Sequence, residues 1–211
     1  MQGLIAKNVT VEFNTPDGNL MRVLDQVTLS VPPAKVVGLT GSSGRGKTTL
    51  GRVMAGLAVP SYGDVFCNGQ PVKNVRTSSG KSTRGKIGMV FQSPRRSCDP
   101  RLTLKQTITQ MMRPNMNILE IMSMVALTSD LLERYPSQVS DGQLQRASMA
   151  RALATRPDYL ILDEMTAMLD PATTATLMDA VRWYTKGGGG VLMISHDHEL
   201  VDAVSDEIYR L

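Results

Sequence analysis

Short apolar runs separated by turn residues dominate the first third of the chain. Hydrophobic and polar positions alternate loosely from Leu4 to Glu12 and again from Val23 to Val31, where Pro32-Pro33 follows. Alternation with a period of two is typical of β-strands. The run from Lys35 to Leu39 is short and continuous, as expected of a buried parallel strand. The segment from Val65 to Gly69 ends in an Asn-Gly pair, which favours a hairpin.

The hydrophobic period changes to a helical one between Leu102 and about Arg134. The apolar residues at helical spacing are Ile108, Met111, Met112, Ile118, Ile121, Met122, Val125 and Ala126. We interpret this stretch as a helical insertion in a strand-rich chain. Elsewhere the pattern predicts strands over 86–91, 159–162, 191–194 and 207–211, and helices over 48–58, 141–155, 171–184 and 197–204. Strands that alternate with helices imply a largely parallel sheet covered on both faces.

Composition and charge narrow the classes of protein. Hydrophobic residues make up 42% and charged residues 20% of the 211 residues, which fits one folded domain. The longest stretch without a charge runs only from Val53 to Gly63, short of the roughly 20 apolar residues that span a membrane. The N-terminal residues do not show the positively charged segment and the long apolar run that together mark a secretory signal, so no such signal is predicted. The two cysteines, Cys67 and Cys98, are not spaced like metal ligands, so we predict no zinc site. So few cysteines are typical of a protein in the reducing cytosol.

The net charge of +4 is mild, and phosphate ligands explain it as well as nucleic acid does. Basic residues gather in the segment 71–86, but no aromatic residues are interleaved there to stack on bases. We therefore predict a solvated loop and no nucleic-acid partner.

A phosphate-binding motif, G-x-x-x-x-G-K-[ST], lies between a predicted strand and a predicted helix. The motif spans the residues Gly41, Ser42, Ser43, Gly44, Arg45, Gly46, Lys47 and Thr48. Every fixed position is matched, by Gly41, Gly46, Lys47 and Thr48. Glycines let backbone N–H groups curl round an anion, and the following helix points its positive end at the same place. Lys47 adds a full charge, and the Thr48 hydroxyl is a Mg²⁺ ligand. The alternative is a glycine-rich turn with a chance lysine, which the flanking elements disfavour.

Two carboxylates follow the predicted strand 159–162. Asp163 and Glu164 stand where that strand should end, and ligands of open α/β sheets sit at the carboxyl ends of strands. We expect Asp163 to hold Mg²⁺ and Glu164 to activate an attacking water as general base.

The segment that contains Ser140, Asp141, Gly142 and Gln143 resembles the signature of the ABC transporter ATP-binding subunit family. The resemblance continues through the segments 147–153, 162–170 and 195–197 and spans nearly the whole chain. It implies an α/β fold: a P-loop NTPase core with a mixed, largely parallel sheet, an N-terminal antiparallel β subdomain and a helical insertion subdomain. Within a single domain 1–211, residues 1–91 and 157–211 would form the ATP-binding core. Residues 92–156 would form the helical subdomain with the signature segment.

The resemblance also implies a head-to-tail dimer that encloses two ATP molecules with Mg²⁺. Each phosphate loop would face the signature segment of the other subunit. Ser140 can cap the helix that begins near Asp141, which leaves a hydroxyl and the Gly142 N–H free to meet a γ-phosphate.

Further roles are carried over from the family one residue at a time. Gln92 resembles the glutamine that contacts Mg²⁺ and water, and His196 the switch histidine at the γ-phosphate. Asp170 resembles an inter-subunit aspartate, and with Pro171 it is also a good helix start. Phe13 resembles the aromatic residue that stacks on adenine, and Thr49 extends the ATP-binding loop. The ordinary alternatives are a surface glutamine, a structural histidine and a core aromatic.

Three residues depart from the family pattern. Asp141 replaces the first glycine of the signature, which favours the helix dipole but brings negative charge near the γ-phosphate of the partner. Met165 replaces a proline and loses a fixed φ angle, and Ala167 replaces a serine. These changes predict one weaker composite site.

The resemblance implies an ATPase subunit at the cytoplasmic face of the inner membrane that powers solute transport. Its partners would be a second ATPase subunit, identical or related, transmembrane permease subunits and an extracytoplasmic solute-binding protein. The segments 91–94, 99–103 and 134–136 resemble the peptide and nickel importer branch. The apolar 108–126 stretch would either contact the permease or pack inside the helical subdomain. Two alternatives remain: a soluble ABC-type ATPase outside transport, and a regulatory partner that binds ATP with weak turnover.

Overall fold

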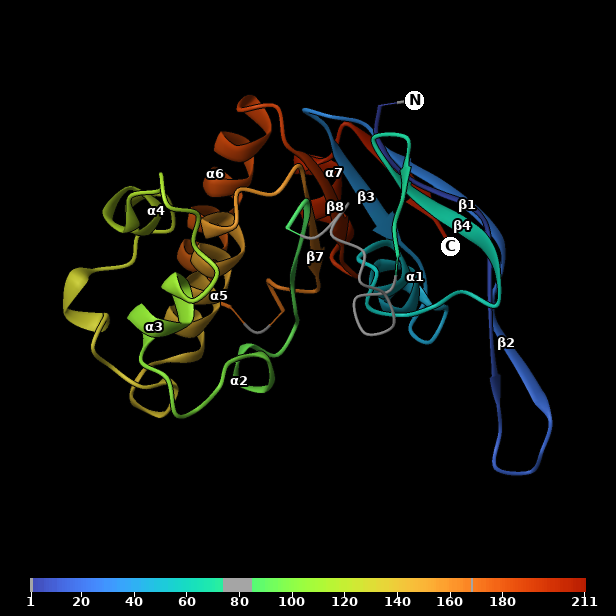
Figure 1. Cartoon of the computed structure of the whole chain (residues 1–211), viewed down its shortest axis with the longest axis horizontal. Coiled ribbons are helices and arrows are strands. Elements are labelled where there is room, and N and C mark those ends of the chain that lie inside the picture. Colours follow the sequence, from blue (N-terminus) through green and yellow to red (C-terminus); the bar gives the residue numbers. More distant parts are fainter. Residues whose placement is uncertain (1, 74–84, 168) are drawn as a thin grey trace.

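The computed structural model describes residues 2–73, 85–167 and 169–211, which form two sheets and a group of helices (Figure 1). The strands are β1 (Leu4–Asn14), β2 (Leu20–Val31), β3 (Val36–Thr40), β4 (Tyr62–Cys67), β5 (Gln70–Pro71), β6 (Ile87–Val90), β7 (Tyr159–Asp163), β8 (Gly190–Ile194) and β9 (Glu207–Arg210). The helices are α1 (Lys47–Met54), α2 (Pro94–Ser97), α3 (Leu104–Thr109), α4 (Ile118–Met124), α5 (Asp141–Ala154), α6 (Pro171–Lys186) and α7 (His198–Val204), with 3₁₀ turns η1 (Ser129–Leu131) and η2 (Pro136–Gln138).

The first sheet is antiparallel, in the order β2-β1-β4-β5. The predicted N-terminal strands are confirmed, as is the hairpin between β4 and β5. Asn68 and Gly69 both have positive φ angles, 51° and 78°, which is the conformation that a tight hairpin turn requires. One face of this sheet lies against α1 and the second sheet.

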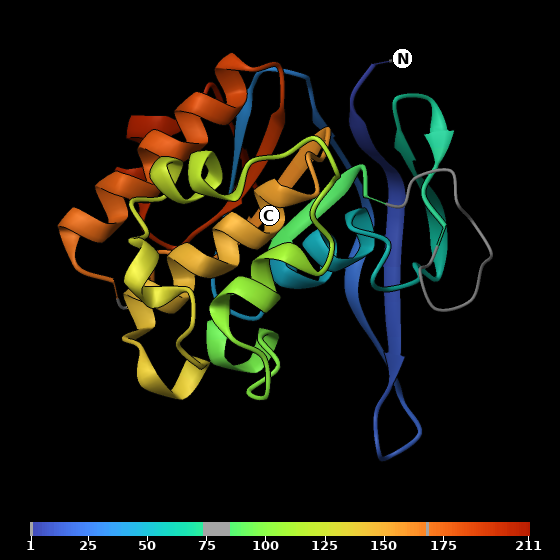
Figure 2. The same cartoon turned by 60° about the vertical axis from the view of Figure 1, so that its left-hand side comes forward.

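The second sheet is parallel throughout, in the order β6-β7-β8-β3-β9. The predicted P-loop α/β fold is thus confirmed, with the antiparallel pairs confined to the first sheet. Alternate residues of each strand enter two different cores. Leu160 and Leu162 pack with the helices α5 and α6, whereas Tyr159 and Ile161 pack with α1 and the first sheet. Figure 2 shows the yellow and orange helices on one side of the parallel sheet, away from the blue N-terminal strands.

The predicted helical insertion, Leu102 to about Arg134, contains α3 and α4, and the helices α2 and α5 lie beside it within residues 92–156. Ile121, Met122 and Val125 are buried in one core with α5 because their spacing places them on one side of α4, and Ile108 of α3 enters the same core. Met111 stays largely exposed. Packing within the helical group therefore accounts for most of the apolar pattern in this region.

Helix α1 is shorter than the predicted 48–58 segment and ends at Met54. The cause is Gly56, whose φ of 72° is left-handed. The Gly56 N–H donates to the Val53 carbonyl and the Leu57 N–H to the Arg52 carbonyl, and this pair of hydrogen bonds terminates a helix.

Membrane-spanning helices and metal-binding clusters were sought among the described residues alone. No helix among them has the length and apolar character needed to cross a membrane. The same residues contain no group of three or more His, Cys, Asp or Glu side chains placed to hold a metal ion. Most of the basic loop predicted over 71–86 falls in the segment 74–84, which lies outside the described residues, as does Met168.

Candidate nucleotide site

The phosphate loop connects β3 to α1, as its sequence context predicts. Gly44 and Gly46 have φ angles of 81° and 88°, which non-glycine residues rarely adopt. A Cβ atom on Gly46 would lie 2.7 Å from the Leu24 side chain and 2.9 Å from the Val23 carbonyl oxygen. Gly46 is therefore required both for the backbone turn and for close packing of the loop on β2.

Lys47 lies at the first position of α1 and is almost fully buried, with 6% of its surface exposed. Its Nζ donates to the carbonyl oxygens of Gly41 at 2.8 Å and Ser42 at 2.9 Å. Among the described residues no carboxylate lies within ion-pair distance of this ammonium group. A buried cation with only neutral partners fits a site for an anionic ligand such as the phosphates of ATP.

Thr48 and Asp163 meet at the end of β7. The Thr48 hydroxyl donates to Asp163 Oδ1 at 2.8 Å. Burial raises the pKa of Asp163 above its ordinary value, the Thr48 hydrogen bond opposes this shift, and the nearby Glu164 carboxylate adds to it. A cation beside Asp163 would relieve this cost. A hydroxyl and a carboxylate oxygen suit Mg²⁺, which usually binds one or two protein oxygens with phosphate and water.

Glu164 is the common partner of two side chains from neighbouring strand ends. Gln92, which follows β6, donates from Nε2 to Glu164 Oε2 at 3.0 Å. His196, which follows β8, places Nδ1 3.8 Å from the same oxygen. Glu164 itself has a left-handed φ of 47°, an unfavourable conformation for a residue with a Cβ. Strain of this kind is concentrated at functional sites.

The turn after Glu164 accommodates Met165 and Ala167, which depart from the family pattern. The Ala167 N–H donates to the Glu164 carbonyl at 3.1 Å, so the turn after Glu164 closes without a proline. Met165 is 3% exposed and belongs to the core beside α5 and α6. Burial of this side chain thus fixes the turn where the family uses a constrained backbone.

The predicted helix start at Ser140 is confirmed. Ser140 Oγ accepts from the Gln143 N–H at 3.2 Å, and Gln143 Oε1 accepts from the Ser140 N–H at 2.9 Å, which is a complete capping box. The Gly142 N–H donates no hydrogen bond within the described residues. Ser140 and Asp141 are exposed, so this helix start is available to a ligand from outside the chain.

One residue at this helix start was not predicted from the sequence. Arg95, in α2, places Nε 2.6 Å from Asp141 Oδ1. It also donates to the carbonyl oxygens of Pro136 at 2.9 Å and Val139 at 3.0 Å. The only sequence clue was that Arg95 stands three residues after Gln92, and no periodic pattern links it to Asp141.

The remaining predicted residues occupy the following positions. Ser42, Ser43 and Arg45 are exposed in the phosphate loop, and Thr49 is half-buried in α1. Phe13 is half exposed near the end of β1, opposite Met21 of β2. Asp170 caps α6 by accepting from the Thr173 N–H at 2.9 Å, so its predicted structural role is confirmed. Its inter-subunit role and the ligand contacts of all these residues stay predictions.

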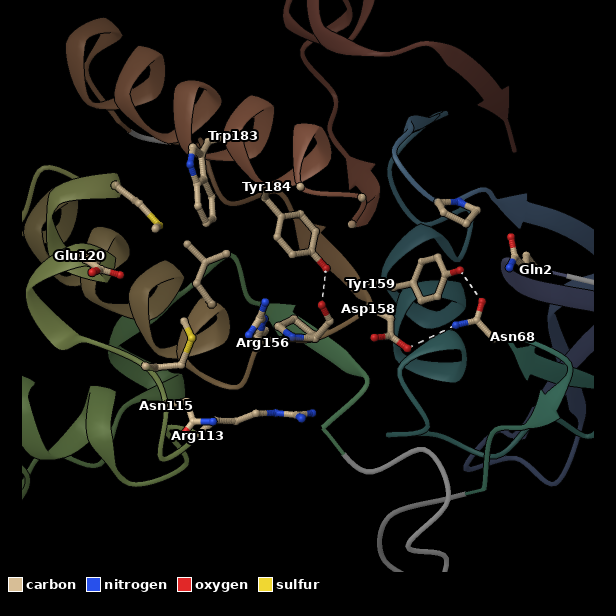
Figure 3. A pocket seen from close by; sticks show the side chains of 18 residues that line it. Gln2, Asn68, Arg113, Asn115, Glu120, Arg156, Asp158, Tyr159, Trp183 and Tyr184 are labelled. Atoms are coloured by element: carbon tan, nitrogen blue, oxygen red, sulfur yellow. Dashed lines mark hydrogen bonds between the residues drawn. The ribbon is translucent and has the colours of Figure 1, made fainter.

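A cavity of about 1080 Å³ lies at the amino ends of β7 and β8, with Asp158 and Tyr159 in its wall (Figure 3). Polar groups in its wall serve the fold: the Tyr159 hydroxyl donates to Asn68 Oδ1 at 2.7 Å, and the Tyr184 hydroxyl donates to the Pro157 carbonyl at 2.9 Å. Burial raises the pKa of Tyr159 to about 12, so this phenol is a neutral donor at physiological pH. The cavity is separate from the carboxyl ends of β3, β7 and β8, where the candidate site is formed.

A glycine-rich phosphate loop between β3 and α1, with Thr48, Asp163 and Glu164 beside it, defines a P-loop nucleotide-binding protein. The family model for the ABC transporter family matches residues 24–167. The chain belongs to this family, and the predicted ABC ATPase class is confirmed at the level of the family.

Relatives and solved structures agree with this assignment. The chain is 34% identical to the methionine import ATP-binding protein MetN 1 of Paraburkholderia xenovorans, over 96% of this chain and 60% of the relative. It is 31% identical to the oligopeptide transport ATP-binding protein OppF of Streptococcus mutans, over 96% of this chain and 69% of the relative. The chain thus spans about 60% of the length of the methionine-import relatives.

Two solved structures of MJ0796, a bacterial ABC transporter cassette, are 27% identical to the chain. Each match covers 99% of this chain and 94% of the chain in the solved structure, with TM-scores of 0.88 and 0.86. Both are dimeric, and the first, a post-hydrolysis state, is bound to ADP and Pi.

Proposed function

We propose that this chain is an ATP-hydrolysing subunit that powers the import of a solute across a membrane. The observation that carries the proposal is the convergence of Gln92 and His196 on Glu164, next to the Thr48–Asp163 pair and the buried Lys47. A protein that only binds ATP needs the phosphate loop but has no use for a carboxylate held by two polar partners.

Each side chain has a role that its chemistry supports. Lys47 and the loop N–H groups would hold the phosphates, and Thr48, Asp163 and Gln92 would hold Mg²⁺, which would offset phosphate charge. Glu164 accepts a proton from the attacking water, with Gln92 orienting that water. His196 is two-thirds exposed, which suits a group that reaches the γ-phosphate only when the site closes.

The second ATPase subunit completes the site by offering its Ser140 helix start to the phosphates. This chain carries both the phosphate-loop half and the signature half, so two copies supply two complete sites. The dimeric MJ0796 cassettes support this arrangement. Asp170 lies in the segment that would meet the partner, and Phe13 would stack on adenine.

The transport partners follow from the family. We infer transmembrane permease subunits, a solute-binding protein, and a peripheral location at the cytoplasmic face of the membrane. The solute is an amino acid or a short peptide, because the relatives described above are named for methionine and oligopeptide import. Nickel, the other solute of the branch predicted from sequence, has no support among these relatives.

The test is phosphate release from Mg-ATP by the purified chain and by Glu164→Gln. We expect turnover to fall by about 100-fold to 10,000-fold, because general-base catalysis is lost, while ATP still binds. Glu133→Gln is the matched control, since Glu133 is exposed and pairs with Lys105 at 3.4 Å, away from the candidate site. Turnover of Glu164→Gln within twofold of the unmodified chain would refute the proposed role of this carboxylate.

A further inference from the structure

The Arg95 guanidinium connects the segment after Gln92 to the start of α5. One nitrogen pairs with Asp141, and the two others donate to carbonyl oxygens of Pro136 and Val139, just before the helix. The guanidinium therefore fixes both the first residue of α5 and the chain that leads into it.

Asp141 poses an electrostatic problem for the proposed composite site. It occupies the first turn of α5, next to the exposed Ser140 and to the Gly142 N–H, which has no partner among the residues that the structure describes. A carboxylate there stabilises its own helix but repels a phosphate approaching the same helix start. The family pattern has glycine at this position, so this chain needs a compensating cation.

We infer that Arg95 is a positioning residue for the composite ATP site: it holds the Asp141 carboxylate aside and neutralises it, so that the start of α5 still attracts the γ-phosphate of the partner. This inference rests on the proposed function. Arg95 acts through Asp141 and through the backbone before Ser140, and it touches no reacting atom.

A second contact ties the same two segments together. Gln145 of α5 is 1% exposed and donates from Nε2 to the carbonyl oxygen of Phe91, the residue before Gln92, at 3.2 Å. Its Oε1 has no hydrogen-bond partner within the described residues. A cavity of about 220 Å³ lies between these segments, lined in part by Gln92, Arg95 and Asp141. The Gln92 segment and the signature helix therefore keep a fixed relation, into which the Arg95–Asp141 pair is built.

The pair should matter in the dimer and not in folding. The Arg95 and Asp141 side chains are 47% and 65% exposed, and an ion pair at that exposure adds little to the stability of a monomer. A closed interface excludes water, so an uncompensated carboxylate beside a triphosphate costs more there than in solvent.

The experiment is a double-mutant cycle in the Glu164→Gln background, in which bound ATP persists. The four proteins of the cycle are the parent, Arg95→Met, Asp141→Gly and the double variant. Arg96→Met is the matched control. Arg96 is the adjacent exposed arginine and makes none of the three contacts. Sedimentation across an ATP series gives the ATP concentration for half-maximal dimer, and a fluorescent ATP analogue reports binding to each monomer.

Arg95→Met should raise the ATP concentration for half-maximal dimer by about tenfold, with unchanged monomer binding. Asp141→Gly should dimerise at least as well as the parent. In the double variant the penalty of Arg95→Met should shrink to less than about twofold, because the charge to be neutralised is gone.

An equal penalty in the Asp141→Gly background would overturn the inference, because Arg95 would then act only through the Pro136 and Val139 carbonyls. A parent that dimerises with ATP while Arg95→Met costs nothing would also overturn it, and would leave the proposed function standing. A parent that binds ATP but never dimerises would overturn both.

Discussion

The two halves of the proposed composite site are built in opposite ways. The phosphate-loop half is assembled inside one chain, from residues that follow β3, β6, β7 and β8, and its key charges are enclosed. Lys47 is 6% and Asp163 4% exposed. The signature half stands at the exposed start of α5, whose core lies on the other side of the parallel sheet from α1 (Figure 1).

The difference concerns how each half satisfies its polar groups. The Thr48 hydroxyl and the Lys47 ammonium find partners within the chain, so folding completes this half. At the start of α5 the capping box satisfies Ser140 and Gln143, but the Gly142 N–H keeps no partner within the described residues. The helix start is therefore fully capped, and its Gly142 N–H remains available for the ligand that we propose.

The largest expected effect comes from the enclosed half. Lys47→Ala removes the buried ammonium group that we propose binds the phosphates, and we expect ATP affinity to fall at least about 100-fold, or roughly 3 kcal/mol. Isothermal titration with ATP measures this change. Lys105→Ala, at an exposed lysine that pairs with Glu133, should bind ATP normally. Equal affinity in Lys47→Ala and the unmodified chain would remove the argument from the phosphate loop.

A smaller effect of a different kind is expected from the exposed half. Ser140→Ala should leave ATP binding to the monomer unchanged and lower turnover about tenfold, because in the proposed dimer this hydroxyl meets the ATP held by the partner and not the ATP of its own chain. The loss of the cap should also cost about 1 kcal/mol of folding stability. Ser140→Thr keeps both hydroxyl and cap and should restore turnover. Loss of monomer binding in Ser140→Ala would place both halves in a single site and break the comparison.

The smallest effect is on stability and depends on pH. Burial raises the pKa of Asp163, so the folded state binds a proton more readily than the unfolded state, and ionisation lowers stability at neutral pH. Asp163→Asn keeps the oxygen that accepts from Thr48 and should raise the free energy of unfolding at pH 7 without nucleotide. The gain should shrink as the pH falls toward the ordinary value of 3.8 and disappear below it, where both states are protonated.

Asp206→Asn is the control of opposite sign. Its pKa is lowered, mainly by the hydrogen bond from the Val36 N–H and then by Lys35. The ionised form therefore stabilises the fold above pH 3.8, and Asp206→Asn should lower the free energy of unfolding at pH 7. Urea titrations at pH 7 and near pH 4 measure both. A decrease for Asp163→Asn at pH 7 would show that this carboxylate is a stabilising group.

The enclosed half was the more predictable from sequence. A local motif fixes the loop from Gly41 to Thr48, and the apolar run before Asp163 marks the end of β7. Strand order was not predictable, since β3 pairs with β8 and β9, whose paired residues follow those of β3 by 155 and 170 residues (Val36 with Val191, Val37 with Glu207). Long-range pairing of this kind leaves no periodic pattern in the chain.

At the exposed half, local rules predicted only the helix start. The pairing of Asp141 with Arg95 joins segments far apart in sequence, so no local rule predicts it. The burial of Met165 against α5 and α6 likewise depends on the tertiary fold. The weaker composite site that these departures from the family pattern indicate stays a prediction.

The central claim, that the two halves meet across two chains, is tested by cross-linking copies that each carry one introduced cysteine. One copy carries Ser43→Cys, the other Ser140→Cys, both in the Glu164→Gln background. Cys67 and Cys98 are buried, and burial raises the pKa of Cys67 to about 11, so neither native thiol should compete. We predict a mixed disulfide dimer with Mg-ATP and none without it. Absence of that dimer at saturating Mg-ATP, while the chain binds the nucleotide, would contradict the account.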